Sequence, residues 1–213
     1  MKVETLVVGA FQENSYLLID EESRRAVLVD PGDEADRLLA AVAASGCTLE
    51  AVWLTHAHLD HVGALAGIAR ATPVPVYLHP ADLPVFDLAP RAAAMYGLPF
   101  ELGPRPDRAL AEGDSLSLGA LRFTVWHLPG HSPGHVAIVG HGTCFGGDIL
   151  FAGSVGRTDL PLSDGVVFQA SLARIATLPG DTTVLPGHGP ATTIDAERRS
   201  NPFLAGSARP LRR

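Results

Sequence analysis

The segment Thr55-His56-Ala57-His58-Leu59-Asp60-His61 places three histidines and one aspartate within six positions. It follows the short apolar run 52–54, which predicts a buried strand, and precedes a run of small residues around 64–70, which predicts a helix. Imidazole and carboxylate groups are the ligands that many transition-metal sites use. A cluster of this kind at a strand end rarely serves packing alone, so the segment predicts a metal site.

Three further strand-like runs end in a small-residue turn that carries a potential ligand. Run 122–127 leads to Gly130-His131, run 143–145 leads to Gly147-Asp148, and run 183–185 leads to Gly187-His188. Glycine lets the backbone bend sharply, and the strand fixes where the ligand begins. The resulting seven side chains exceed what one tetrahedral ion needs, so they predict two adjacent ions that share a carboxylate. The candidate metal ligands are His56, His58, Asp60, His61, His131, Asp148 and His188.

The rest of the chain alternates strand-like and helix-like segments. Strands are predicted at 3–8, 16–19, 26–29, 52–54, 74–78, 115–118, 122–127, 136–139, 143–145 and 183–185. Helices are predicted at 34–44 with Asp33 as the N-cap, 64–70, 81–86, 91–96, 165–177 and 194–200. Strand-rich halves, each followed by helices, predict an α+β fold in which two sheets pack together with helices outside.

These motifs together resemble the metallo-β-lactamase superfamily. The resemblance extends from Gln12-Glu13-Asn14-Ser15-Tyr16 and Val29-Asp30-Pro31-Gly32 through the histidine cluster to Pro186-Gly187-His188-Gly189. It implies a four-layer αββα sandwich with the metal site at one edge. Carried over by motif, the resemblance gives the ligands in three groups: His56, His58 and His131 for one metal, Asp60, His61 and His188 for the second, and Asp148 as the bridge. Asp60 and Asp148 are then the expected catalytic carboxylates, with Asp60 also able to carry a proton.

Within the superfamily, the chain most resembles glyoxalase II, the hydroxyacylglutathione hydrolases. The segments that carry this resemblance are Gly147-Asp148-Ile149-Leu150-Phe151 and Gly156-Arg157-Thr158-Asp159. The second segment suggests Arg157 as a substrate-binding residue, and a salt bridge with Asp159 is the alternative. Glyoxalase II adds a C-terminal helical domain with basic groups for glutathione, whereas only 25 residues follow His188 here. We therefore expect a looser glutathione site.

Three other residues near the motifs have plausible supporting roles. Asp30 and Thr55 could orient the ligands from behind, or could be an ordinary turn carboxylate and strand-end hydroxyl. His135, four residues after His131, could also lie behind the metal ligands. The sequence leaves these alternatives open.

The expected activity is that of a dinuclear metal-dependent hydrolase. A water shared by two divalent ions loses a proton near neutral pH and can attack a thioester carbonyl, such as that of an S-2-hydroxyacylglutathione. The expected ions are two Zn²⁺, although the same ligands accept Fe²⁺ or Mn²⁺. The alternatives are a mononuclear iron persulfide dioxygenase, which needs only two histidines and one aspartate, a lactonase or phosphodiesterase, and a binding protein without activity.

Composition restricts the partners and the organisation of the protein. The 213 residues carry a net charge of −7, and an acidic surface argues against nucleic-acid binding. No apolar run reaches the length of a membrane span, and two cysteines cannot build a disulfide framework. We therefore expect a cytoplasmic protein that acts on a small molecule, such as a glutathione conjugate. It should form one domain over residues 1–213, with a basic tail over 198–213, and its oligomeric state stays open.

Overall fold

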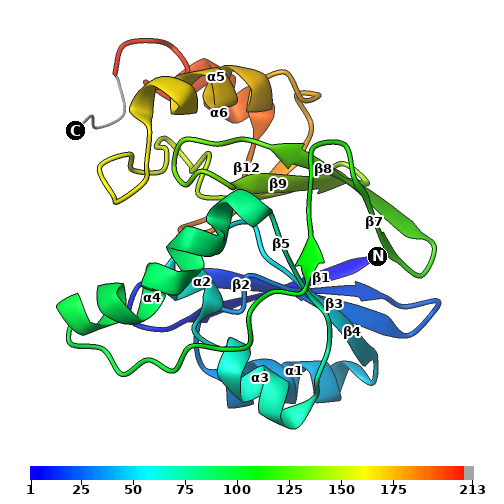
Figure 1. Ribbon diagram of the computed structural model, residues 1–213. Helices are drawn as coiled ribbons and strands as arrows, with labels where there is room; N and C mark the ends of the chain where they lie inside the picture. Colours follow the sequence, from blue (N-terminus) through cyan, green and yellow to red (C-terminus); the bar gives the residue numbers. More distant parts are fainter. Residues whose placement is uncertain (209–213) are drawn as a thin grey trace.

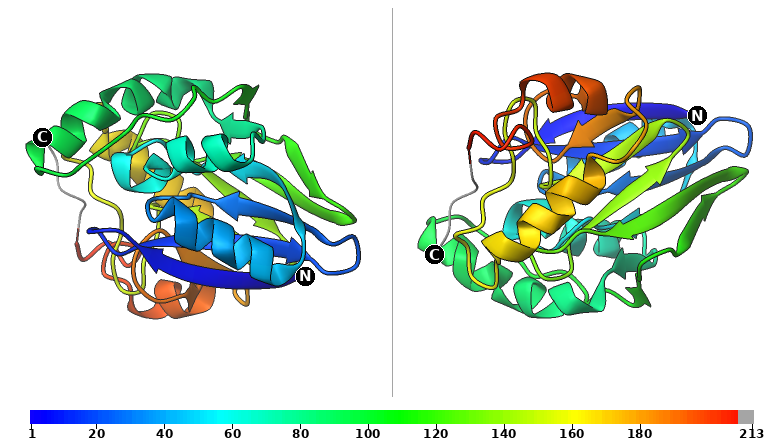
Figure 2. Two further views of the ribbon diagram at one scale, coloured as in Figure 1. Left: turned by 90° about the horizontal axis from the view of Figure 1, so that it is seen from below. Right: turned by 90° about the horizontal axis from the view of Figure 1, so that it is seen from above.

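The molecule consists of two facing mixed sheets with helices on both outer faces. The structure, a computed structural model, describes residues 1–208. Each sheet has six strands, in the orders β1-β2-β3-β4-β5-β6 and β12-β11-β10-β9-β8-β7 (Figure 1). Seen from below, α1 and α3 cover the first sheet, and seen from above, α5 and α6 cover the second (Figure 2). This confirms the expected αββα sandwich of the metallo-β-lactamase fold.

The elements of the first half run through the first sheet and its helices. Its strands are β1 (Lys2–Val8), β2 (Glu13–Asp20), β3 (Arg25–Val29), β4 (Thr48–Trp53), β5 (Val76–Leu78) and β6 (Arg108–Ala109). Its helical segments are α1 (Ala35–Ser45), α2 (Leu59–Val62), α3 (Leu65–Ala71), the 3₁₀ turn η1 (Pro80–Asp82) and α4 (Leu83–Met95).

The second half builds the second sheet and its two helices. Its strands are β7 (Ser115–Leu118), β8 (Leu121–His127), β9 (Val136–Gly140), β10 (Thr143–Gly147), β11 (Thr183–Pro186) and β12 (Thr192–Thr193). Its helices are α5 (Gly165–Ile175) and α6 (Ile194–Ser200). Within residues 1–208, none of the helices combines the length and the apolar composition that a bilayer span requires.

Alternate residues of β2 serve two different cores. Every residue of β2 is buried, with Leu17 among the helix-facing core residues and Leu18 in the layer between the sheets. Trp53, Phe123 and Phe145 fill that middle layer. Trp53 and Phe123 meet edge to face with ring centroids 5.8 Å apart. This packing fixes the two sheets against each other, so the loops at their strand ends are held on rigid supports.

The strand ends that carry ligands meet along one edge. β10 pairs with β11 in parallel, and Gly147 lies opposite Pro186, so the turns that follow both strands emerge side by side. The first sheet reaches the same edge, because the Asn14 side chain donates to the Pro186 carbonyl at 2.9 Å and the Tyr16 hydroxyl donates to it at 2.6 Å. The fold thereby brings together ligands that are far apart in the sequence.

The helix predictions were wrong at two places. Segments 81–86 and 91–96 belong to the 3₁₀ turn η1 and the continuous helix α4, with Pro90 inside it. Proline removes one backbone donor, but the apolar face that includes Val85 and Ala89 stays buried on both sides of it. At α1, Glu34 rather than Asp33 is the N-cap residue, with φ at 53°, and Asp33 Oδ1 accepts the Glu34 N–H at 2.6 Å.

The short strands β6 and β12 were not predicted, because two-residue strands carry no periodicity. At the C-terminus, Arg198 and Arg199 belong to α6, so the helix includes the first residues of the expected basic tail. Arg198 donates to backbone carbonyl groups, at 2.8 Å to that of Ala176 and at 2.7 Å to that of Leu178. The tail residues 209–213 lie outside the described part of the chain.

Candidate metal centre

Four loops and one short helix bring the seven predicted ligands together. His56 and His58 follow β4, and Asp60 and His61 lie on α2. The others come from the second sheet. His131 follows β8, Asp148 follows β10 and His188 follows β11. Five of the seven therefore lie in loops that follow strands, and Asp60 and His61 lie on the short helix after the β4 loop.

The first group consists of three imidazole rings whose nitrogens point at one another. His131 Nε2 lies 2.9 Å from His58 Nδ1 and 3.2 Å from His56 Nε2. Burial, followed by the neighbouring histidines, lowers the pKa of His56 and of His58 well below the usual range. These rings are therefore neutral, which is the form of histidine that binds a metal.

The second group combines Asp60, His61 and His188. Asp60 Oδ2 lies 3.2 Å from His188 Nε2 and 3.9 Å from His61 Nε2. Asp148 lies between the two groups, with Oδ1 3.6 Å from His61 Nε2 and Oδ2 3.5 Å from His131 Nε2. A carboxylate that faces one histidine of each group has the geometry of a bridge.

The protonation of the histidines in the second group differs from that in the first. Burial opposes the charged form of His61, but the carboxylates of Asp148, Asp60 and Asp30 outweigh it and raise the pKa of His61 well above the usual value. Burial likewise opposes ionisation of Asp60, but His61 and His188 outweigh it and lower the pKa of Asp60. The carboxylates thus hold protons on the rings, and metal binding would release them.

Two buried atoms show that the pocket suits a cation. Among the described residues, His61 Nε2 and Asp148 Oδ1 have no hydrogen-bond partner, and they face each other at 3.6 Å. A buried polar atom without a hydrogen-bond partner destabilises the fold unless a bound ion or molecule contacts that atom. Convergent imidazole nitrogens and carboxylate oxygens match the ligand preferences of Zn²⁺, Fe²⁺ and Mn²⁺. The residues present therefore fit divalent metal ions.

Asp30 and Thr55 support the ligands from behind. Asp30 Oδ1 accepts the Thr55 N–H at 2.7 Å, and Asp30 Oδ2 accepts the Thr55 hydroxyl at 2.6 Å. The same Oδ2 lies 3.1 Å from His61 Nδ1, and Thr55 Oγ1 lies 3.1 Å from His56 Nδ1. In each ring the contact is made at Nδ1, whereas Nε2 faces the other proposed ligands. Asp30 therefore has the position of an orienting residue.

His135 supports the Asp148 turn. The Asp148 N–H donates to His135 Nε2 at 3.0 Å, and His135 is fully buried. This turn and the neighbouring turn after β11 each require a glycine. A Cβ on Gly147, where φ is +49°, would lie 2.3 Å from Thr55 Oγ1, and a Cβ on Gly187 would lie 2.2 Å from Asp148 Oδ1. The backbone at both glycines thus packs directly against Thr55 and Asp148, where any larger residue would clash.

Two buried carboxyl groups near the centre were missed in the sequence. Asp82 accepts the Ala57 N–H and the Ser132 hydroxyl at 2.8 Å each, and the Gly134 N–H at 2.6 Å, so it joins the loops after β4 and β8. Glu13 is also buried, with Oε1 3.8 Å from His61 Nδ1. Asp82 looks like an ordinary helix-start aspartate, and Glu13 stands in the motif Gln12-Glu13-Asn14-Ser15-Tyr16, which indicated the family but gave Glu13 no role.

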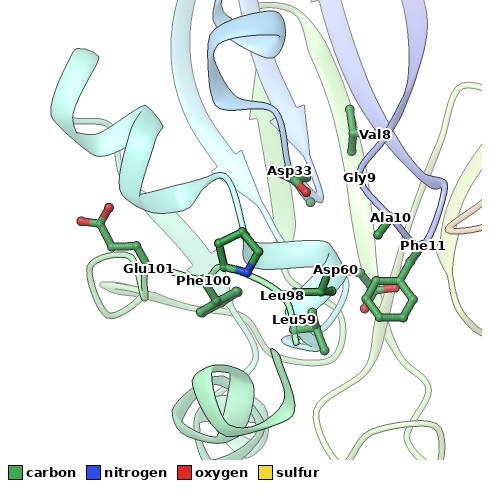
Figure 3. Close-up of a pocket in the computed structure, with 13 residues that line it drawn as sticks. Val8, Gly9, Ala10, Phe11, Asp33, Leu59, Asp60, Leu98, Phe100 and Glu101 are labelled. Atoms are coloured by element: carbon green, nitrogen blue, oxygen red, sulfur yellow. The ribbon is translucent and has the colours of Figure 1, made fainter. Parts of the chain in front are cut away.

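Two cavities border the centre. One, of about 380 Å³, is lined by several of the ligands and by Arg157. Arg157 also forms a two-point ion pair with Asp159, with N–O distances of 2.6 and 2.7 Å. The other cavity, of about 410 Å³, shares Phe11, Leu59 and Asp60 with the first. Figure 3 shows Phe11 beside Asp60 at one end of the second cavity and Glu101 at the other.

Comparison with known proteins gives the family. The model of the metallo-β-lactamase superfamily matches residues 8–188, which include all seven ligand candidates. The chain belongs to the metallo-β-lactamase superfamily. A relative within it, hydroxyacylglutathione hydrolase GloC of Haemophilus influenzae, is 39% identical over 209 residues, covering 96% of this chain and 98% of that protein.

Solved structures of the superfamily agree with this assignment. TTHA1623 in a di-iron-bound form has a TM-score of 0.87 and 49% identity, covering 94% of this chain and 100% of that one. The B3 metallo-β-lactamase BLEG-1 has a TM-score of 0.89 and 37% identity, covering 96% and 100%. The superfamily and these relatives make the chain a metal-dependent hydrolase whose His/Asp clusters form a divalent-metal site.

Proposed function

We propose that the protein is a dinuclear metal-dependent thioesterase, acting on thioesters of the S-2-hydroxyacylglutathione type. The observation that carries this proposal is Asp148, whose two oxygens face a histidine of each ligand group at 3.6 and 3.5 Å. Similarity to hydroxyacylglutathione hydrolase GloC supports the choice of substrate.

The proposed ligands divide into two sets and a bridge. His56, His58 and His131 would hold one ion, Asp60, His61 and His188 would hold the other, and Asp148 would contact both. Bound there, two divalent ions such as Zn²⁺ acidify a water and polarise a carbonyl group.

The side chains of the protein supply positioning and proton transfer. Asp60 faces His188 at 3.2 Å, and its side chain is 17% exposed at the edge of the 380 Å³ cavity. A carboxylate that lines the cavity can receive the proton lost by the attacking water and pass it to the leaving thiolate. During this proton transfer, Asp30 and Thr55 hold the rings of His61 and His56 in place.

Covalent catalysis by a side chain is not supported. Among the residues described, no serine or cysteine lines the cavity. Cys144 is fully buried in β10, and burial raises the pKa of its thiol to about 12. Direct attack by water is the mechanism that the site favours.

The second ligand group distinguishes the hydrolase from the dioxygenase. A mononuclear iron site of two histidines and one aspartate would leave Asp60, His61 and His188 without a role. In the structure these three still converge, with ligand atoms within 4.8 Å of one another. Their retention favours a dinuclear site, and the experiment below separates the two activities.

The test uses metal-stripped protein reloaded separately with Zn²⁺, Fe²⁺ or Mn²⁺. Release of free thiol from S-lactoylglutathione is measured beside oxygen consumption with glutathione persulfide. Thiol release supports the proposal, and Asp148→Asn should lower its rate by at least about 10²-fold. The exposed Asp181 provides the control Asp181→Asn, which should leave the rate unchanged.

Other outcomes would contradict the proposal. Oxygen consumption by the iron form without thiol release from any form would favour the dioxygenase. Cleavage of a lactone, a phosphodiester or a β-lactam in place of the thioester would keep the metal site and reject the substrate.

A further inference from the structure

The 380 Å³ cavity opens directly onto the metal centre. Five of the seven proposed ligands line it, so a molecule bound there must touch the reacting atoms. Its volume is within the range of cavities that bury small ligands. Apart from the ligands, most of its lining is apolar. The chemistry of this lining therefore bears on which substrate can enter.

One wall of the cavity is a face of α4. Val85, Leu88, Ala89, Ala92 and Met95 recur at helical spacing and all line the cavity. Val85 and Ala89 are buried, whereas Leu88 is 36% exposed and Met95 is 80% exposed. This face thus forms an apolar path from the metal centre to the surface, and a mostly apolar lining is typical of cavities that bind small molecules.

The rest of the cavity is mostly apolar as well. Phe11, Phe151, Val155 and Leu160 line it. Phe11 packs edge to face against Tyr96, with ring centroids 5.1 Å apart, so two aromatic rings line the cavity beside the C-terminal end of α4. A chain lying between these walls would lose water on several sides.

Charge in the cavity disfavours an anionic chain. Within residues 1–208, Arg157 is the only lysine or arginine that lines it, and its Nε and Nη2 already donate to the two carboxylate oxygens of Asp159. An incoming carboxylate would have to compete with that two-point pair. A neutral apolar group meets no such obstacle.

We propose that this cavity takes the acyl half of the substrate and selects an aliphatic acyl chain longer than lactoyl. The carbonyl would lie at the metal centre and the chain would run along the α4 face. This inference rests on the proposed thioesterase activity and specifies its acyl class. Ala92 is the residue that we assign to setting how long a chain fits, because it lines the cavity between Ala89 and Met95 on α4.

The test is a series of S-acylglutathiones from acetyl to octanoyl, with S-lactoylglutathione as the reference. A fully buried methylene contributes enough free energy to raise kcat/KM by about fourfold per added carbon. We expect kcat/KM to rise along the series until the cavity is full. A flat or falling series, with S-lactoylglutathione still cleaved best, would overturn the inference and leave the thioesterase proposal intact. If no thioester is cleaved, the thioesterase proposal itself fails.

Matched substitutions at two positions of α4 distinguish an effect on the cavity wall from a general effect on the helix. Ala92→Leu should shorten the preferred chain, and Ala92→Asp should reduce activity on long chains more than on acetyl. Ala94 is exposed on the same helix and does not line the cavity, so Ala94→Leu and Ala94→Asp should leave the chain-length profile unchanged. Equal profiles for Ala92→Leu and Ala94→Leu would contradict the assignment.

Binding without turnover gives a readout independent of the metals. S-hexylglutathione and S-methylglutathione are thioethers that cannot be hydrolysed, and calorimetry with metal-stripped protein compares their affinities. The hexyl compound should bind at least tenfold more tightly, and Ala92→Asp should remove the difference. Equal affinity for the two compounds in the unmodified protein would contradict an apolar acyl cavity.

Discussion

Asp30 holds two ligand rings at once. Its Oδ2 lies 3.1 Å from His61 Nδ1 and accepts the Thr55 hydroxyl, which in turn lies 3.1 Å from His56 Nδ1. His61 and His56 belong to different ligand groups, so one carboxylate fixes part of both. Such partners commonly matter almost as much as the ligands themselves.

Asp30→Asn should therefore weaken metal binding without removing a ligand. The substitution removes the negative charge and one acceptor, and we expect the affinity for Zn²⁺ to fall by about 10- to 100-fold. Competition against a chromophoric chelator measures this affinity. Asp33→Asn, three residues away and exposed, is the control. Equal affinity in Asp30→Asn and the unmodified protein would show that Asp30 does not orient the rings.

His79 should make the stability of the protein depend on pH. Its ring stacks on that of His127 with centroids 4.0 Å apart, and burial, followed by His127, lowers the pKa of His79 to about 4. Asp114 partly opposes this shift. In the unfolded chain, His79 has an ordinary histidine pKa near 6.5. Between about pH 4 and pH 6.5, the unfolded chain therefore binds more protons at His79 than the folded chain does. The contribution of His79 is thus complete above about pH 6.5 and is lost as the pH falls towards 4.

The substitution His79→Asn removes this proton-binding group. Asparagine keeps an acceptor for the Ala81 N–H, which His79 Nδ1 accepts at 3.2 Å. Urea unfolding at pH 7 and pH 5, in the presence of a chelator, should show a smaller loss of stability in the variant than in the unmodified protein. An unchanged loss would mean that His79 does not contribute to the pH dependence.

Some residues of the site were predictable and others were not. His56, His58, Asp60 and His61 stand within one heptapeptide, so their spacing alone suggested a metal site. Asp82 could not be found this way, because its partners Ala57 and Ser132 lie 25 and 50 residues away and its own neighbours resemble a helix start. Local spacing carries information about ligands but not about the groups that hold their loops.

Among the elements, β10 connects the core to the metal centre. Phe145 on this strand is fully buried, with its ring 5.6 Å from that of Tyr16 and 6.1 Å from that of Phe123. Tyr16 belongs to the first sheet, so this contact crosses the layer between the sheets. Three residues later the same strand leads to Asp148.

Phe145→Ala should destabilise the fold strongly. Removing a buried phenylalanine leaves a cavity between the sheets, and we expect the free energy of unfolding to fall by about 3–5 kcal/mol. Guanidinium unfolding measures the change. Val166 is 68% exposed on α5, and Val166→Ala should change stability by less than about 0.5 kcal/mol. A loss below about 1 kcal/mol in Phe145→Ala would show that the layer can close around the cavity.

Element prediction succeeded where periodicity was clear and failed at helix α4. The central strands follow apolar runs, and helix α6 begins and ends at the predicted residues. Pro90 divided α4 into two predicted helices, because the sequence does not reveal that Val85 and Ala89 pack on the same side as Ala93. That misplaced break also hid the apolar face that lines the cavity.

At the scale of the whole molecule, the two sheets contribute complementary parts of one site. The loop after β4 and helix α2 provide four of the proposed ligands from the first half, and the loops after β8, β10 and β11 of the second sheet provide His131, Asp148 and His188. Asn14 and Tyr16 tie the last of these turns to the first sheet through the Pro186 carbonyl. The pairing of sheets was implied by the family resemblance, whereas these ties depend on packing that the sequence does not display.

Zinc titration of metal-stripped protein, in competition with a chromophoric chelator, tests the proposed dinuclear centre most directly. We predict two tightly bound Zn²⁺ per chain in the unmodified protein and about one in His188→Ala, with the affinity of the remaining ion close to that of the first site. A single bound ion in the unmodified protein, or two tightly bound ions in His188→Ala, would contradict the dinuclear centre.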